Sequence, residues 1–224
     1  MNLEEKTKIL VDYIRSLNDF EIVKEIDGNY DHMGATITDA MLQAGTTYET
    51  VVRPRVQRIQ EQYPEARTIS EFIKIIDEVG IYKILQWNDE EKPKRILGVV
   101  NFFKKENIET ETDLKQWLQE INNIEKLKRL RGIGNKTADY FKILVGIQTS
   151  AVDRHLDTFL SEAKIKVNGY IEAQQLINKA AGQMGVNRAY LDHSIWKYMS
   201  SKKPKPLMRR RIGDDKSCEI KRCI

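Results

Sequence analysis

A turn with two glycines constrains the fold of this chain more than any other feature. It follows a stretch in which Ile124 and Leu127 lie on one face of a predicted helix, and it precedes a second helical pattern that begins at Asn135. Gly132 and Gly134 permit positive φ and leave no Cβ in the way of a close approach. The sequence therefore predicts two helices joined by a tight turn, with Asn135 as the N-cap of the second helix.

The start of this second helix has the chemistry of an anion site. The first amide groups of a helix have no partner within the helix, and neighbouring glycines leave them open to a ligand, usually a phosphate. The candidate phosphate-binding residues are Gly132, Ile133, Gly134, Lys136 and Thr137. For the two glycines alone, a plain corner between two helices without a ligand is the better explanation.

Lys136 and Asp153 add reactive chemistry to the turn. Lys136 lies in the first turn of an apolar helix predicted over residues 135–146, where the helix dipole and apolar packing both disfavour an ammonium. A neutral lysine is a nucleophile. Asp153 precedes the next predicted helix along the chain, residues 154–163, so it can cap that helix and remain ionised. An exposed lysine and an ordinary capping aspartate would explain either residue alone, but a fixed carboxylate can also stabilise a nearby cation.

Together, these segments resemble the signature of the helix-hairpin-helix DNA glycosylase superfamily, of the endonuclease III and oxoguanine-glycosylase type. The family pattern is a Gly-hydrophobic-Gly turn, then Lys-hydroxyl-Ala, and later Val-Asp-x-His. The residues that carry the resemblance are Leu130, Gly132, Ile133, Gly134, Lys136, Thr137, Ala138, Val152, Asp153 and His155. Arg131 departs from the pattern, since the family often has proline there; it adds a cation beside the turn and loosens it.

The resemblance implies a base-excision repair enzyme, a DNA glycosylase with AP-lyase activity that acts on double-stranded DNA containing a damaged base. It implies that Lys136 forms a Schiff base and that Asp153 is the catalytic aspartate. A monofunctional glycosylase, in which water attacks, is one alternative, although such relatives usually carry another residue at the position of Lys136. A non-catalytic protein that uses the turn only to bind DNA phosphate is the other.

The resemblance also implies a loop that enters the DNA and fills the gap left by an extruded base. The candidate inserting residues are Gln43, Thr46, Thr47 and Tyr48, which lie between a buried helix predicted over residues 35–46 and a basic helix predicted over residues 51–63. A simple loop between helices explains them equally well. The helix predicted over residues 51–63 is basic because it carries Arg53, Arg55 and Arg58.

No organic cofactor is expected. The family allows a monovalent cation at the carbonyl groups of the turn, but no other metal is predicted. Many endonuclease III relatives end in a four-cysteine iron–sulfur loop, and this chain has only Cys218 and Cys223, so no cluster is expected. These two cysteines are predicted to be free thiols.

Composition sets wide limits on partners and location. The net charge of +4 in 224 residues permits a nucleic-acid partner without requiring one. No apolar run approaches the roughly 18 residues of a membrane span, and the first ten residues do not resemble a secretory signal. We therefore expect a monomeric intracellular protein without a membrane partner, in the cytoplasm (with the nucleoid in a prokaryote) or in the nucleus.

The periodicity predicts an all-α protein of about ten helices, because helix formers dominate and no alternating pattern indicates a strand. We expect two helical lobes, one of residues 33–146 and one combining 1–32 with 147–200, with a DNA-binding cleft between them. Residues 201–224 form a basic tail, either a DNA-contacting arm or a solvated extension. Trp87 and Trp117 are interpreted as core residues, and Asp192 and His193 as the polar edge of a packed helix.

Overall fold

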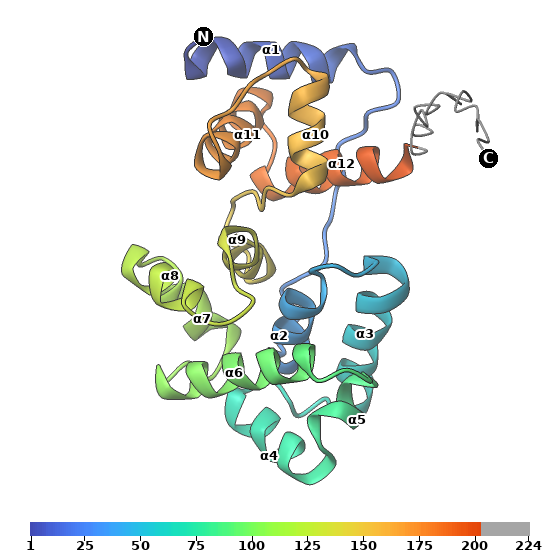
Figure 1. The fold of residues 1–224 in the computed structure, drawn as a ribbon, viewed down its shortest axis with the longest axis vertical. Coiled ribbons are helices and arrows are strands. Elements are labelled where there is room, and N and C mark those ends of the chain that lie inside the picture. Colours follow the sequence, from blue (N-terminus) through green and yellow to red (C-terminus); the bar gives the residue numbers. More distant parts are fainter. Residues whose placement is uncertain (203–224) are drawn as a thin grey trace, which may run out of the picture.

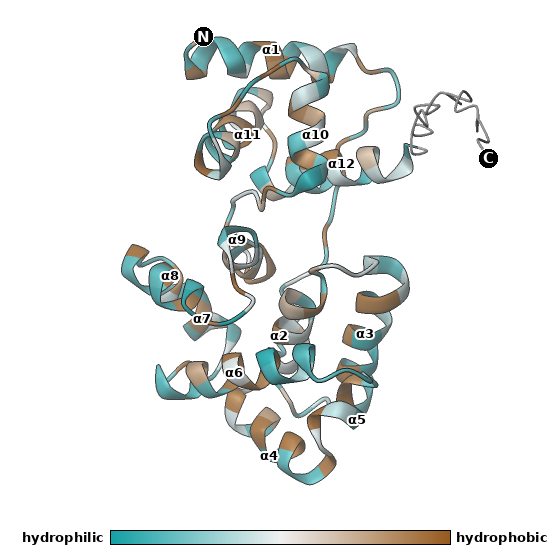
Figure 2. Ribbon diagram, in the orientation of Figure 1, coloured by the Kyte–Doolittle hydropathy of each residue, from teal (hydrophilic) through white to brown (hydrophobic). Residues whose placement is uncertain are grey.

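The computed structural model describes residues 1–202, which form twelve α-helices and one π-helical turn with no β-strand (Figure 1). The prediction of an all-α protein is confirmed. The basic tail from Lys203 onward, with Cys218 and Cys223, lies outside the described residues. Hydrophobic and hydrophilic residues alternate along the helices (Figure 2), as expected where each helix packs one face on its neighbours.

One hydrophobic cluster takes residues from Met33 to Val145. Its elements are α2 (Met33–Leu42), η1 (Tyr48–Val52), α3 (Arg53–Gln62), α4 (Ile69–Val79), α5 (Ile81–Leu85), α6 (Glu91–Lys105), α7 (Glu111–Trp117), α8 (Ile121–Lys128) and α9 (Asn135–Leu144). Every residue of α2 is buried, because α3, α4, α6 and α9 pack around it. The predicted core residue Trp117 packs edge-on against Phe102 and Phe103.

A second hydrophobic cluster joins the start of the chain to its later helices. It contains α1 (Leu3–Ser16), α10 (Arg154–Glu162), α11 (Tyr170–Met184) and α12 (Arg188–Ser201), which lie together at the top of Figure 1. The connector from α1 to α2 and the connector from α9 to α10 both cross between the two clusters (Figure 1). Residues far apart in the sequence therefore meet where the clusters face each other.

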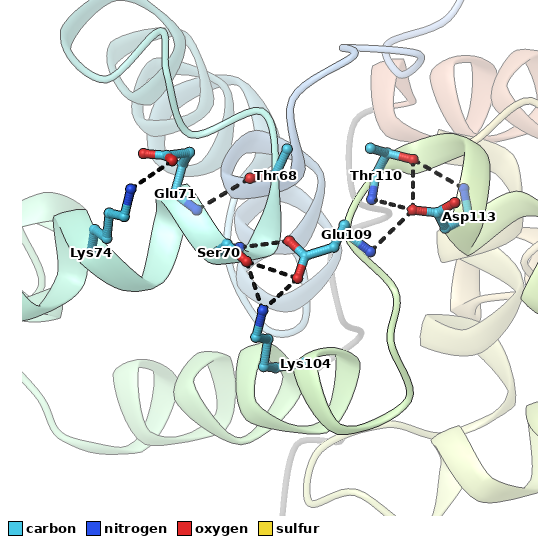
Figure 3. A network of polar contacts seen from close by, with 8 residues as sticks. All are labelled: Thr68, Ser70, Glu71, Lys74, Lys104, Glu109, Thr110 and Asp113. Carbon is cyan, nitrogen blue, oxygen red and sulfur yellow. Dashed lines mark hydrogen bonds and ion pairs between the residues drawn. The ribbon is translucent and has the colours of Figure 1, made fainter.

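A polar network fastens the segment after α6 to α4 (Figure 3). The Lys104 amine donates to the Glu109 carboxylate and the Ser70 hydroxyl, both at 2.6 Å, and Ser70 donates its amide and hydroxyl to Glu109 at 2.8 Å. Thr110 and Asp113 close a capping box at the start of α7. This part of the first cluster is thus held by side chains that lie away from the cavity described below.

The helix after the glycine turn begins at Asn135, as predicted, but Asn135 is not its N-cap. Gly134 takes that place with an extended backbone, φ −104° and ψ −169°, and no side chain accepts from the first-turn amides. A glycine cap has no side-chain oxygen to offer. The amides at the start of α9 consequently lack the side-chain cap that half of the α-helices in residues 1–202 have.

Candidate active site

A cavity of about 870 Å³ lies where the two hydrophobic clusters face each other. The first cluster contributes the loop between α2 and η1 and the first turns of α9. The second contributes the start of α10 and one side of α12. The wall includes Lys136 and Asp153, together with all four residues predicted to enter the DNA, Gln43, Thr46, Thr47 and Tyr48.

Lys136 and Asp153 approach each other across this cavity from opposite clusters. The Lys136 amine (Nζ) lies 3.6 Å from Asp153 Oδ2, and the two side chains are 35% and 13% exposed. Asp153 is the N-cap of α10, as predicted: its Oδ1 accepts from the amides of His155 at 2.8 Å and Leu156 at 3.2 Å. One carboxylate oxygen therefore fixes the direction of the side chain, while the other remains turned toward the lysine.

The glycine turn leaves the start of α9 open. Gly134 has free space where a Cβ would stand. Gly132 has φ +88°, and a Cβ there would come within 2.6 Å of the Arg95 side chain, which lies across it. Arg131 is paired with Glu91 at 2.9 Å, so it is engaged in the free protein. The anion-site geometry is present at Gly134, at the mouth of the helix that carries Lys136.

The other predicted phosphate ligands are restricted by burial. The side chains of Ile133 and Thr137 are buried, with 5% and 6% of each residue exposed. Thr137 can therefore offer a phosphate only its backbone amide, and the Ile133 amide already donates to the carbonyl of Leu130 at 3.1 Å. Lys136 is the candidate in this group whose charged side chain faces the cavity.

Lys92 of α6 binds the end of α2 and the loop that follows it. The Lys92 amine donates to the carbonyls of Met41, Leu42 and Ala44 at 2.9, 3.3 and 2.6 Å. Burial, and then the nearby Arg95 guanidinium, lower the pKa of Lys92. A lysine on the open carbonyls at the end of α2 stabilises the negative end of the helix dipole and fixes where the loop begins.

Gln43, the first residue of that loop, is incompletely bonded. Its side-chain nitrogen (Nε2) is buried and has no hydrogen-bond partner within residues 1–202. Thr46, by contrast, donates its hydroxyl to the carbonyl of Leu42 at 2.6 Å. A ligand that accepts a hydrogen bond from the Gln43 side-chain nitrogen would therefore give this atom a partner that it lacks within residues 1–202.

Asp192 is a cavity residue that the sequence interpretation missed, because it was taken as the polar edge of a packed helix. Its Oδ2 accepts from the amide of Ala151 at 2.5 Å, in the connector just before Asp153. Burial raises the pKa of Asp192 to about 8; the Ala151 amide and Lys136 oppose this shift, and the charge of Asp153 supports it. Asp192 therefore binds a proton near neutral pH. The signal in the sequence that could have singled out Asp192 was its place as an acid among the apolar residues of α12.

Aromatic rings form much of the remaining wall. Trp196 lies one turn after Asp192 and contacts the ring of His193, with centroids 5.2 Å apart. Burial lowers the pKa of His193. Tyr48 meets Trp196 edge-on at 6.5 Å and so joins the two clusters. Trp87 packs against the first cluster, as predicted, but also borders the cavity, with the Arg55 guanidinium over its ring at 5.1 Å.

The arginines of the predicted basic helix are already occupied. Arg53 pairs with Asp27 at 3.0 Å and Glu49 at 3.2 Å. Arg55 donates to three backbone carbonyls, and Arg58 donates to that of Ile84. None of the three arginines lines the cavity, although Arg53 and Arg55 lie against the rings of the cavity residues Tyr48 and Trp87.

The fold and this cavity define an all-helical protein in which a lysine and a capping aspartate face each other between two helical clusters. The chain belongs to a family described as a domain of unknown function (DUF8548), which matches residues 8–200. No curated protein matches the chain. In residues 1–202, no helix is long and apolar enough to cross a membrane, and no three His, Cys, Asp or Glu side chains are grouped as a metal ion would require.

Proposed function

We propose that this protein is a base-excision repair enzyme, a DNA glycosylase that also cleaves the strand as an AP lyase. The observation that carries the proposal is the Lys136 amine at the cavity wall, 3.6 Å from the Asp153 carboxylate. Displacement of a base requires a nucleophile and a fixed negative charge beside the sugar. The resemblance of the glycine turn and of Val152-Asp153 to glycosylases supports the same assignment.

The cavity suits a nucleotide turned out of the duplex. Enzymes that act on a base take it out of the stack into a pocket, where flat side chains contact it. About 870 Å³ lies within the range of roughly 300–1,000 Å³ typical of small-molecule sites. Trp87, Trp196 and Tyr48 supply the flat walls, and the neutral Asp192 carboxyl can donate a hydrogen bond as well as accept one.

The proposed reaction uses Lys136 as the free amine. Its nitrogen forms a bond to the sugar C1′ while the bond from C1′ to the base breaks, and the base leaves with that electron pair. Asp153 stabilises the cationic sugar and accepts a proton from the lysine nitrogen. The C1′–O4′ bond then breaks as the nitrogen lone pair forms the C=N double bond, and O4′ takes up a proton, so the sugar ring opens to a Schiff base. This Schiff base makes the C2′ proton acidic; removal of that proton expels the 3′ phosphate by β-elimination and nicks the strand.

Two further parts hold the substrate. The amides at Gly134 and the first turn of α9 bind a backbone phosphate near the damaged nucleotide, which fixes register without reading sequence. The loop from Gln43 to Tyr48 fills the gap that the base leaves. Because the Gln43 amide nitrogen has no hydrogen-bond partner within residues 1–202, its movement into the duplex breaks none of the described hydrogen bonds at that atom. A monovalent cation at the turn carbonyls stays a prediction.

Borohydride trapping tests the proposal on a panel of duplexes, each with one damaged base. We expect the wild type to form a covalent complex with at least one duplex and Lys136→Gln to form none. The matched control is Lys142→Gln, on the same helix. Lys142 is paired with Asp139 at 3.0 Å and does not line the cavity, so this variant should trap like the wild type.

The outcomes separate the alternatives. Full trapping and nicking by Lys136→Gln would show that Lys136 is not the nucleophile. Base release without trapping would indicate the monofunctional enzyme, in which water attacks. Tight DNA binding with neither base release nor trapping would indicate a protein that only binds DNA.

A further inference from the structure

A buried carboxylate next to the cavity gathers three tyrosines. Asp39, in the middle of α2, is fully buried. Its Oδ2 accepts from the hydroxyls of Tyr30 at 2.6 Å and Tyr48 at 3.1 Å, and its Oδ1 accepts from Tyr140 at 3.2 Å. Within residues 1–202, every side-chain hydrogen bond to this carboxylate comes from a tyrosine.

The three tyrosines belong to different parts of the molecule. Tyr30 lies in the connector before α2. Tyr48 ends the loop that is proposed to enter the DNA, and Tyr140 follows Lys136 by one turn on α9. Tyr48 and Tyr140 both line the cavity. Asp39 therefore ties the cavity loop and the lysine helix to one point in the core.

The charge of Asp39 decides how many of these bonds can exist. An ionised carboxylate only accepts and has room for three donors, whereas a protonated carboxyl must donate its own proton and accepts fewer. Burial raises the pKa of Asp39 to about 6, against the opposing effect of the three tyrosine hydroxyls and with support from Asp27. Neutral pH thus leaves Asp39 ionised, and mild acid protonates it.

The other charged groups around α2 are held by partners of their own. Asp27 of the connector pairs with Arg53 of α3, whose guanidinium lies 5.5 Å from the centre of the Tyr48 ring. Lys92 of α6 binds the carbonyls at the end of α2, and Glu111 of α7 bonds to Thr36 at its start. None of these groups bonds to the Asp39 carboxylate in the described part of the chain.

We propose that ionised Asp39 is a positioning residue that holds the cavity loop at a set distance from the lysine helix, and that its protonation releases Tyr48 and slows base release. The second part rests on the proposed function, because it needs a reaction to slow. The first part does not, since it concerns the loop alone.

The activity test compares two reactions of the same enzyme. Base release from a damaged duplex needs the loop, whereas cleavage of a preformed abasic site in single-stranded DNA needs Lys136 but no gap to fill. Both rates share the requirement for a free lysine amine, so their ratio reports on what base release alone needs, and the variants below separate the loop from the other requirements. We expect the wild-type ratio to fall as the pH drops through about 6.

The variants follow from the hydrogen bonds. Asp39→Asn cannot ionise and accepts on only one oxygen, so the ratio should be about tenfold lower at all pH values and show no step near pH 6. Tyr48→Phe keeps the ring but loses the hydrogen bond to Asp39, so it should lower the ratio. Tyr30→Phe is the matched control: it removes a bond to the same carboxylate from outside the loop. It should leave the ratio unchanged above the pH step and move the step itself to higher pH, because the Tyr30 hydroxyl lowers the pKa of Asp39. A wild-type ratio in Asp39→Asn across the pH range would overturn the proposal.

Hydrogen exchange tests the loop without any activity. Amides of residues 43–48 should lose protection below about pH 6 in the wild type, and at all pH values in Asp39→Asn and Tyr48→Phe, while those of α4 should not. Unchanged protection in Tyr48→Phe and in the acidified wild type would refute the positioning role even if Asp39→Asn failed to fold. If the loop responds as expected but no DNA is cleaved, the proposed function fails and the positioning role stands.

Discussion

The two faces of the cavity are built in different ways. On the face from the first cluster, side chains hold the parts: Lys92 binds the carbonyls that end α2, and Asp39 binds three tyrosine hydroxyls. On the face from the second cluster, the backbone does so: Asp153 and Asp192 both accept from main-chain amides. The first face can therefore be loosened by changing single side chains, whereas the acids of the second face keep their direction when only their charge is changed.

The largest expected effect separates charge from position on the second face. Asp153→Asn keeps an oxygen that can cap α10 but loses the negative charge beside Lys136. Base release should fall by about 10²–10³-fold, while the melting temperature changes little. The matched control is Asp157→Asn on the same helix, outside the cavity wall. If Asp153→Asn also lowered the melting temperature strongly, the lower rate could be explained by lost structure. The main-chain amides would then not be sufficient to hold residue 153 in place without its charge.

The next effect concerns the pH dependence of stability. In the unfolded chain Asp192 ionises near pH 4, whereas burial holds its folded pKa at about 8, so between these values the folded protein binds one proton more. The stability from this proton is complete below about pH 4 and is lost as the pH rises toward 8, with a slope of up to about 1.4 kcal/mol per pH unit. Urea unfolding of the wild type and Asp192→Asn from pH 5 to 9 measures it.

Asp192→Asn should flatten that slope. The residual slope should combine two groups. Asp39 acts with the same sign over a lower range because its folded pKa is about 6, and His193 acts with the opposite sign because burial lowers its pKa. Identical slopes in the wild type and the variant would show that the Asp192 carboxyl is not held neutral by its surroundings.

The third effect tests the side-chain anchoring of the first face. Lys92→Met removes three hydrogen bonds to the carbonyls at the end of α2 while keeping an apolar stem. We expect a loss of about 1–2 kcal/mol in the free energy of unfolding, measured in urea, because a half-buried cap is lost. Lys94→Met, on the exposed side of the same helix, should leave the unfolding curve unchanged. Equal curves for the two variants would argue that the loop is anchored elsewhere.

The smallest effect separates the two glycines of the turn. Gly132→Ala strains a positive φ and meets Arg95, so it should cost about 1–2 kcal/mol of stability. Gly134→Ala meets open space in an extended backbone and should not change stability. It should nevertheless weaken DNA binding several-fold in a filter or fluorescence assay, because the methyl group narrows the approach to the α9 amides. Equal DNA affinity for Gly134→Ala and the wild type would place the phosphate site elsewhere.

Much of the local structure around the turn was predictable from the chain. Asp153 as a cap and the helix that starts at Asn135 follow from short-range patterns, and both are observed. Gly134 rather than Asn135 as the N-cap was not predictable, since both residues suit that position. The pairing of Lys136 with Asp153 was an implication of the resemblance, and the structure places them 3.6 Å apart.

The residues that sequence patterns missed are those whose role depends on packing between distant segments. From the sequence alone, Asp192 is interpreted as part of the polar edge of an amphipathic helix. Its contact with the connector that carries Ala151 is visible only in the folded structure. From the sequence alone, Asp39 is an isolated acid in an apolar helix. In the structure it accepts hydrogen bonds from Tyr30, Tyr48 and Tyr140. The spacing along α12 places Asp192 among apolar residues, but no spacing along the chain reveals the hydrogen-bond partners of Asp192 or of Asp39.

Local patterns in the chain were sufficient to predict an all-α protein, the glycine turn and the start of the helix after it, because backbone freedom and periodicity act within a few residues. The roles of Lys136 and Asp153 rest on the resemblance. The cavity and the protonation of its acids were decided by the way two helical clusters face each other. Desolvation depends on everything that surrounds a group in space, so the charge of Asp39 and Asp192 near neutral pH is a property of the folded molecule and not of its sequence neighbours.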